Sequence, residues 1–438
     1  MLFIPVAGVT AQVPDGPADS VAVRLVDLLV RGDYPAVEAM FDTTMAQALP
    51  EAKLRTTWES LAAQVGGFQK QTGTRTQQVQ AFKAVIVSVQ FERASLDFRV
   101  VVDTADKVRG FFIQPAAPSG DAALPPYAPR QGSYHERELV VGAAGWPLPG
   151  TLLMPESTTR VPGVVLVQGS GPHDRDETIG PNKPFRDLAL GLVAQGIAVL
   201  RYDKRTFTSG SAMVLSGQPI TVEEETVADA LAALDSLRGM PGVDPARIYL
   251  VGHSLGGYLA PRIAARDGKL AGVVVLAGNT RPLEDLIVEQ LDYLAAHAPS
   301  SDRTGAAQRQ AMLEQVAKIK ALTPADSASR TFLFGAPAVY WLDLRSYDPV
   351  RVAGGLTIPL LILRGERDYQ VTAADAAGWQ SLAGRAATSF RTYPGLNHLF
   401  LAGAGPSLPE EYQRAGHVAE EVIHDIAAWV RALGAPHL

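Results

Sequence analysis

The chain has 438 residues, of which 47% are hydrophobic, so it can build a large core and is long enough for two or three domains. Its 39 basic and 45 acidic residues give a net charge of −6, which argues against a nucleic-acid-binding surface, and no run of about 18 apolar residues predicts a membrane-spanning helix. The absence of cysteine excludes disulfides, thiolate catalysis and cysteine-ligated metals.

Residues 1–12 form a short apolar segment that contains Val9-Thr10-Ala11, which is similar to the small-residue site where export signals are cleaved. No positively charged stretch precedes it. Two interpretations follow: the tail of an export signal, or a frayed apolar start of a cytoplasmic protein. We favour export to the periplasm or the medium, and we assign residues 1–19 to a tail or a signal-peptide remnant.

Residues 20–114 show helical periodicity first and strand periodicity after Gly66-Gly67. The expected helices are 20–31, 35–41 and 51–65. The expected strands are 79–91, 95–102 and 108–113. Helices followed by strands indicate a small α+β domain over residues 20–114, and the segment 115–132, rich in Pro, Ala and Gly, is the expected linker.

Residues 133–438 alternate between apolar runs and helical patterns, which is typical of a mostly parallel sheet with helices on both faces. The expected strands are 134–141, 148–154, 161–167, 197–200, 247–251, 272–276, 359–363 and 389–393. The expected helices are 185–194, 222–237, 258–266 and 417–433. A further helical stretch at about 280–346 interrupts the alternation and is too long for a structureless loop. We expect it to form a cap over the active site; the alternative is a surface excursion.

The most informative motif is Gly252-His253-Ser254-Leu255-Gly256, because a strand pattern precedes it and a helix pattern follows it. In that setting Gly-x-Ser-x-Gly predicts a nucleophile elbow, a tight strand-to-helix turn that lifts the serine hydroxyl above the edge of the sheet. The flanking glycines allow strand and helix to approach closely. Ser254 is therefore the expected nucleophile.

A serine hydroxyl becomes a good nucleophile when a base takes its proton and an acid orients that base. In a sheet of this kind the acid and then the histidine follow the serine in chain order. His398, in the loop after strand 389–393, is the expected base. His297 falls in the predicted cap, and His417 and His424 fall on the predicted terminal helix, where we expect them to be solvated or packed.

The acid is expected in the loop after strand 359–363. Asp368 is the first candidate and Glu366 the second. The structural alternative for either carboxylate is an exposed loop charge, or an ion pair with Arg364 or Arg367.

The tetrahedral intermediate of acyl transfer needs two N–H donors aimed at its oxygen. Leu255 follows the nucleophile and is expected to supply one of them. The loop after strand 161–167 should supply the other, from Ser170 or, failing that, Gly171; the alternative is an ordinary strand-to-loop turn. Gly171 and His253, beside these donors, are expected to contact the substrate.

Two charged strings, Asp174-Arg175-Asp176 and Asp203-Lys204-Arg205, lie near the predicted site. These strings could bind a polar group of the substrate, or they could form ion-pair networks that hold the long loops in place. We favour the ion-pair networks. The nearest approach to a metal-ligand pattern is His173 with Asp174 and Asp176, and its spacing is not convincing. We expect no metal and no cofactor.

With these motifs in place, residues 133–438 resemble the α/β-hydrolase superfamily. The runs 169–189 and 200–205 are similar to bacterial esterases of that superfamily, and residues 20–114, with Gly32-Asp33-Tyr34 and Met40-Phe41-Asp42, resemble the cystatin-like domain of unassigned function that often precedes them. The resemblance implies an α/β-hydrolase fold with a helical cap, and a serine carboxylesterase acting on a small-molecule, short-chain ester. Gln168 stands where many relatives carry histidine, but the expected donors are backbone groups.

Two other functions stay open. One is a peptidase or amidase that uses the same triad, because the fold does not determine the substrate. The other is an envelope-associated binding protein that works through the N-terminal domain. The sequence does not indicate an oligomeric state.

Overall fold

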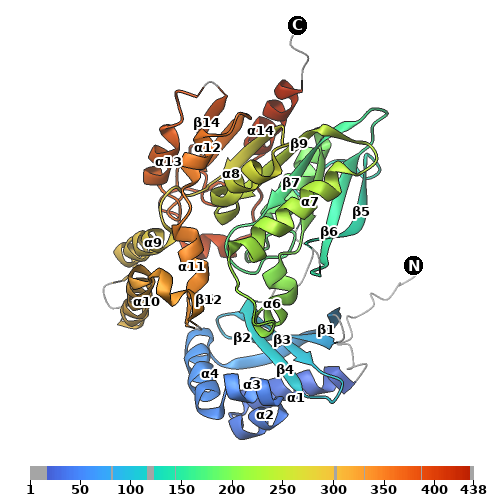
Figure 1. The fold of residues 1–438 in the computed structure, drawn as a ribbon. Helices are drawn as coiled ribbons and strands as arrows, with labels where there is room; N and C mark the ends of the chain where they lie inside the picture. Colours follow the sequence, from blue (N-terminus) through green and yellow to red (C-terminus); the bar gives the residue numbers. More distant parts are fainter. Residues whose placement is uncertain are drawn as a thin grey trace, which may run out of the picture. The chain divides into compact units, whose positions relative to one another are not determined.

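The computed structural model describes residues 17–79, 82–115, 123–143, 145–299, 303–329, 331–385 and 387–434. The chain divides into two compact units, residues 1–121 and 122–438, so the division falls inside the expected linker 115–132 (Figure 1). The apolar segment 1–12, expected as the remnant of an export signal, lies outside the described residues.

The first unit is an α+β domain in which four helices precede a four-stranded sheet. Its helices are α1 (Pro17–Val30), α2 (Tyr34–Met40), α3 (Thr43–Ala48) and α4 (Glu51–Val65). Its strands are β1 (Phe68–Val79), β2 (Phe82–Phe91), β3 (Ser95–Val102) and β4 (Val108–Pro115), antiparallel and adjacent in chain order. Trp58 of α4 packs against Phe91 and Phe98, with ring centroids 6.2 and 6.0 Å away, in the core between helices and sheet.

The sequence did not predict two elements of this unit. Strand β1 is almost entirely polar and lies at the edge of the sheet, so it buries too little side chain to show a period of two. Helix α3 has only six residues, and the side chain of Asp42 caps it by accepting the N–H of Met45 at 2.7 Å.

The second unit is built on an eight-stranded sheet in the order β14-β13-β10-β9-β7-β8-β6-β5. The strands are β5 (Tyr134–Val141), β6 (Leu148–Pro155), β7 (Val161–Val167), β8 (Ala198–Tyr202), β9 (Val243–His253), β10 (Gly272–Leu276), β13 (Leu360–Gly365) and β14 (Thr388–Tyr393). From β8 to β14 the neighbours are parallel, while β6 is antiparallel to both β5 and β8. Strand β7 is buried along its whole length, as expected for a strand covered on both faces.

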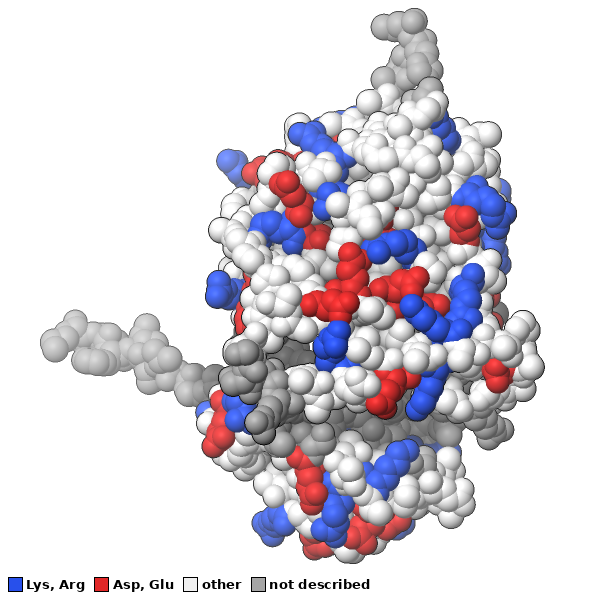
Figure 2. Space-filling view, turned by 90° about the vertical axis from the view of Figure 1, so that its left-hand side faces the viewer, with Lys and Arg blue, Asp and Glu red and all other residues white. Residues whose placement is uncertain are grey.

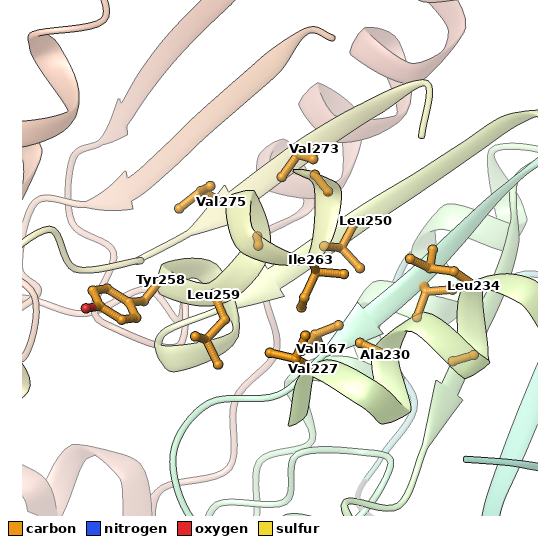
Figure 3. Close-up of a cluster of buried hydrophobic side chains, with 14 of the residues drawn as sticks. Val167, Val227, Ala230, Leu234, Leu250, Tyr258, Leu259, Ile263, Val273 and Val275 are labelled. Atoms are coloured by element: carbon orange, nitrogen blue, oxygen red, sulfur yellow. The ribbon is translucent and has the colours of Figure 1, made fainter. Parts of the chain in front are cut away.

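Alternate residues of each central strand feed two separate cores. In β10, Val273 and Val275 join one cluster, whereas Val274 and Leu276 join the other. Helices α7 (Ala228–Arg238) and α8 (Leu255–Asp267), labelled in Figure 1, cover the first face. Helices α5 (Pro184–Ala194) and α14 (Glu420–Leu433) cover the second. Figure 3 shows the first cluster, in which side chains of β9 and β10 meet Leu259 and Ile263 of α8. This packing fixes α8 on the sheet, and with it the turn at its N-terminus.

Outside residues 283–345, the other described helices of this unit lie at its edges and in its connections. They are α6 (Arg205–Leu215), the π-helix η1 (Glu223–Val227), α12 (Pro349–Gly354), α13 (Ala373–Gln380) and the 3-10 helix η3 (Pro409–Gln413). Among the described residues, no helix combines the length and apolarity needed to cross a membrane. On the face shown in Figure 2, basic and acidic side chains are interspersed and form no single basic patch.

A mainly helical insertion separates β10 from β13, as the sequence predicts. It contains α9 (Leu283–His297), α10 (Arg303–Ala321), η2 (Pro324–Ala328), the short strands β11 (Phe332–Leu333) and β12 (Ala336–Pro337), and α11 (Ala338–Arg345). Polar contacts attach α11 to the elbow helix α8: Tyr258 donates its hydroxyl to the carbonyl of Leu344 at 2.9 Å, and Arg262 pairs with Asp343 at 3.0 Å.

Candidate active site

Ser254 occupies the turn between β9 and α8 with φ 53° and ψ −117°, a strained conformation for a residue with a side chain. The glycines around it are sterically required. A Cβ on Gly256 would lie 2.2 Å from the carbonyl oxygen of Val167, and a Cβ on Gly252 would lie 2.3 Å from that of Gly256. The backbone therefore has the geometry of the predicted nucleophile elbow.

His398 and Asp368 form a buried pair in two adjacent loops. His398 Nδ1 lies 2.7 Å from Asp368 Oδ2, and each residue is at most 5% exposed. Asp368 Oδ1 accepts the N–H groups of Gln370 and Val371 at 2.8 and 2.9 Å. With Nδ1–H donated to the carboxylate, the lone pair of His398 is on Nε2, the atom that a base needs.

Glu366, the second candidate for the acid, is exposed, and the neighbouring Arg367 pairs with Glu411 at 2.8 Å. The structure thus brings Asp368, and not Glu366, to the histidine.

A cavity of about 210 Å³ brings Ser254 and His398 together. Its lining residues come from the loops after the strands and from η3: Gly169, Ser170, His173, Glu177, Ile179, His253, Ser254, Gln370, His398, Leu399 and Tyr412. None of these described lining residues belongs to the insertion, and the expectation that the insertion forms a cap over the serine stays a prediction. The insertion contacts this wall through α9: Gln290 donates its side-chain amide to the carbonyl oxygen of the lining residue Gln370 at 3.0 Å, and Tyr293 stacks on Tyr369 with ring centroids 4.9 Å apart.

Two backbone N–H groups suit an oxyanion hole: that of Ser170, which lines the cavity, and that of Leu255, which follows the lining residue Ser254 but is not itself among the described lining residues. The N–H groups of Ser170 and Leu255 meet no acceptor among the described residues, and Leu255 is the first residue of α8, where a helix carries partial positive charge. Gly169 packs against the nucleophile, because a Cβ there would lie 3.1 Å from Ser254 Cβ. Gly171, which the sequence suggests as the alternative donor and as a substrate contact, has φ 95° and is not among the described residues that line the cavity.

His253 was expected to contact the substrate, and its ring does line the cavity. Both of its nitrogens, however, are held by protein groups: Nε2 lies 3.0 Å from the carbonyl oxygen of His398, and Nδ1 lies 3.0 Å from Glu177 Oε1. Sequence reasoning missed Glu177. Its only signal was its place in a charged loop, and nothing in the spacing indicated contact with a residue 76 positions further on.

The charged strings form ion pairs that brace the loops, which confirms the favoured interpretation. Arg175 pairs with Asp203 at 3.0 Å, Arg205 pairs with Asp229, and Arg201 pairs with Asp176. These pairs join the long loop after β7 to the end of β8 and to α7.

Lys204 connects this network to the candidate oxyanion hole. It is 1% exposed, pairs with Glu225 at 3.2 Å and donates to the carbonyl oxygen of Gly169 at 2.7 Å. That carbonyl belongs to the same peptide group as the N–H of Ser170. The ammonium group therefore polarises the peptide that presents the candidate donor.

The other histidines considered as bases lie elsewhere. His297, the last residue of α9, bonds to the carbonyl of Tyr293 at 2.8 Å, and His424 is an exposed residue of α14. His417 lies before α14, which begins only at Glu420, and its Nδ1 is 3.1 Å from Asp187 Oδ2. The part of the chain that the structure describes contains no cluster of three or more His, Cys, Asp or Glu side chains that could hold a metal ion.

Comparison with known proteins identifies the family. Residues 164–422 match the model of the alpha/beta hydrolase family, and residues 22–111 match a family described as a protein of unknown function (DUF3887). Esterase EstD of Thermotoga maritima is 37% identical over 416 residues, which cover 95% of this chain and 96% of that protein. The chain therefore belongs to the alpha/beta hydrolase family, and the fold expected from the sequence is confirmed.

Some solved structures resemble this chain more distantly. The hyperthermophilic esterase from the archaeon Pyrobaculum calidifontis has a TM-score of 0.45 and 18% identity, over 70% of this chain and 85% of that one. Est1E from Butyrivibrio proteoclasticus has a TM-score of 0.44 and 15% identity, over 67% of this chain and 99% of that one.

Proposed function

We propose that this protein is a serine carboxylesterase that hydrolyses short-chain carboxylic esters through an acyl-enzyme intermediate. The observation that carries the proposal is the cavity in which Ser254, on a strained elbow, and His398, bonded to buried Asp368, line the same space. The relative from Thermotoga maritima, which aligns over nearly the full length of both chains, is named as an esterase.

In the first half of the reaction, Ser254 Oγ attacks the ester carbonyl carbon while His398 Nε2 takes the hydroxyl proton. Asp368 keeps the Nδ1–H tautomer of His398 in place and stabilises the imidazolium that forms. When the tetrahedral intermediate collapses, the bond from carbon to the alcohol oxygen breaks, and His398 returns the proton to that oxygen. The alcohol leaves and the acyl group remains on Ser254.

In the second half, water replaces the alcohol. His398 removes a proton from the water as it attacks the acyl carbon, and the proton then goes to Ser254 Oγ as the bond to the acid breaks. In both halves the N–H groups of Ser170 and Leu255 stabilise the oxyanion, which is worth about 3–4 kcal/mol per donor.

The cavity supports a short acyl chain as the substrate group. Its volume of about 210 Å³ is small for a ligand site, and Ile179, Leu399 and Tyr412 give it an apolar wall. Gln370 and Tyr412, joined by a hydrogen bond of 3.2 Å, add polar groups at one side.

A comparison of p-nitrophenyl acetate or butyrate with the corresponding p-nitroanilides tests the proposal. We expect rapid release of p-nitrophenol and little or no release of p-nitroaniline. Efficient anilide turnover would instead favour the peptidase or amidase function, and turnover of neither would contradict a hydrolytic role for the cavity.

A further inference from the structure

Glu177 and His253 form a buried contact that is not part of the triad. It reaches both the loop that carries His398 and the loop that carries Ser170. His253 precedes the nucleophile at the end of β9, and Glu177 lies in the long loop after β7. The two residues are 4% and 1% exposed. Phe185, a residue of the buried core, lies edge-on to the His253 ring at 6.5 Å between centroids.

The two neighbours of the His253 ring determine its protonation. Nε2 faces the carbonyl oxygen of His398 at 3.0 Å, and a carbonyl oxygen only accepts, so Nε2 carries a proton. Nδ1 faces Glu177 Oε1 at 3.0 Å, and that same oxygen accepts the N–H of Gly169 at 2.6 Å, as a carboxylate does. An ionised carboxylate also only accepts, so Nδ1 carries a proton as well.

The charges agree with this assignment. A buried carboxylate needs a compensating charge, and Glu177 Oε2 finds no hydrogen-bond partner within the described part of the chain. Burial opposes ionisation of both groups, but the facing carboxylate raises the pKa of His253, and the facing imidazolium lowers the pKa of Glu177.

We propose that His253 is held as an imidazolium in an ion pair with Glu177, and that this pair positions the catalytic base and the oxyanion loop relative to each other. One end of the pair holds the backbone of His398. The other end holds the N–H of Gly169, whose own carbonyl shares a peptide group with the Ser170 N–H. His253 and Glu177 are thus positioning residues, and they do not exchange protons with the substrate.

The strained backbone of Glu177 supports a specific role for this contact. Glu177 has φ 51°, which is uncommon for a residue with a side chain. Such strain persists only where the surrounding structure fixes the residue. Here the hydrogen bonds to His253 and Gly169 are the contacts that fix the side chain.

The titratable groups near the His253–Glu177 pair come from four loops at this edge of the sheet. They are Glu177 and His173 after β7, Lys204 after β8, Asp368 after β13 and His398 after β14. Burial lowers the pKa of His173, so it stays neutral near the pair. Asp368 adds a smaller negative influence that also favours the imidazolium.

Glu177→Gln is the informative variant, because both wild-type contacts use one oxygen. Glutamine can present its oxygen to Gly169 and His253, but it removes the charge, so we expect the pKa of His253 to fall. Once deprotonated, the ring can serve only one of its two acceptors. Activity should then decline on the alkaline side from a lower pH than in the wild type, with kcat falling by up to the order of 10²-fold and KM changing little.

Asp187→Asn is the matched control. Asp187 on α5 is also a buried carboxylate bonded to a histidine Nδ1, that of His417 at 3.1 Å, but neither residue lines the cavity. We expect this variant to lose stability and to keep the wild-type dependence of kcat/KM on pH.

The experiment has a spectroscopic arm that does not depend on ester hydrolysis, whereas the kinetic arm rests on the proposed function. In full-length protein labelled with ¹⁵N-histidine, one of the eight histidines should remain an imidazolium at about pH 8, where an ordinary histidine with a pKa of about 6.5 is neutral. That signal should persist in Asp187→Asn and be lost in Glu177→Gln. If Glu177→Gln does not fold, Glu177→Asp replaces it; its carboxylate should keep the imidazolium signal, while its shorter reach lowers kcat.

Absence of an imidazolium at about pH 8 in the wild type would overturn the ion pair. A Glu177→Gln enzyme with wild-type kcat and pH profile would overturn the positioning role. Failure of all ester turnover, with the imidazolium signal present, would count against the proposed function and leave the ion pair standing.

Discussion

Gly365 and Tyr393 are paired across the neighbouring parallel strands β13 and β14, so the loops that carry Asp368 and His398 start side by side. The two loops are in contact directly after the strands end, because a Cβ on Gly365 would lie 2.3 Å from the carbonyl oxygen of Leu396. This register, and not proximity in sequence, sets the 2.7 Å contact between acid and base.

The first prediction concerns the identity of the acid. Asp368→Asn keeps the size of the side chain but stabilises the wrong tautomer of His398, so kcat should fall by about 10³–10⁴-fold. Glu366→Gln, a charge change two residues away on an exposed side chain, should leave kcat within about twofold of wild type. Steady-state kinetics on a p-nitrophenyl ester measures both, and the reverse order would reassign the acid.

Lys204 should matter for catalysis although it does not face the substrate in the mechanism. Lys204→Met removes the ammonium group that polarises the Gly169–Ser170 peptide, so we expect kcat to fall by roughly 10–100-fold, less than the loss of a whole donor. Because this variant removes the positive charge that faces buried Glu225, the double change Lys204→Met with Glu225→Gln separates catalysis from folding. Lys183→Met, which removes a nearby lysine paired with Asp176, is the control and should keep kcat.

Acyl-chain preference should follow the apolar wall of the cavity. Ile179→Ala removes three carbon atoms from the lining and makes room for a longer acyl chain. The ratio of kcat/KM for octanoate esters to that for butyrate esters should therefore rise, by about fourfold for each extra methylene that is buried. The control is Leu124→Ala, an exposed residue outside the cavity, which should keep the wild-type ratio. An unchanged ratio in Ile179→Ala would show that the acyl chain does not lie against this wall.

Acid stability should depend on Glu411, which braces the loop of the catalytic histidine. Burial works against its ionisation, but hydrogen bonds from Ser407, Asn397 and Arg367 together lower its pKa. A lowered folded-state pKa contributes stability above the unfolded-state pKa of about 4.3, and that contribution is lost as the pH falls below it.

In thermal unfolding, Glu411→Gln should therefore be about 1–3 kcal/mol less stable than wild type near neutral pH, with the difference shrinking below about pH 4. Glu410→Gln, a charge change at the exposed neighbouring residue, should unfold like wild type at every pH. If the two variants had the same unfolding free energy at every pH, Glu411 would not contribute to acid stability.

Sequence patterns were sufficient for most elements of the larger unit because its strands are buried on both faces and its helices are amphipathic. The same patterns failed where side chains stay in water or are short and polar. Strand β1 is one example, and helix α6, with Gly210 among several Ser and Thr residues and a kink at Ser209, is another.

The candidate triad was predictable because each member follows a recognisable strand in a set order. The walls of the cavity were not, because Ile179, Gln370 and Tyr412 come from segments whose approach depends on the packing of long loops. The same holds for Glu177, whose partner His253 on β9 is adjacent only in the folded chain.

Reaction with a p-nitrophenyl alkylphosphonate tests the role of Ser254 most directly, because this reagent phosphonylates an activated serine and releases p-nitrophenol. We predict one equivalent of p-nitrophenol and a mass increase of one alkylphosphonyl group, located by peptide mapping at Ser254. Ser254→Ala should fold like wild type, take up no reagent and hydrolyse no ester. An adduct on another residue, or ester turnover retained by Ser254→Ala, would contradict the proposed nucleophile.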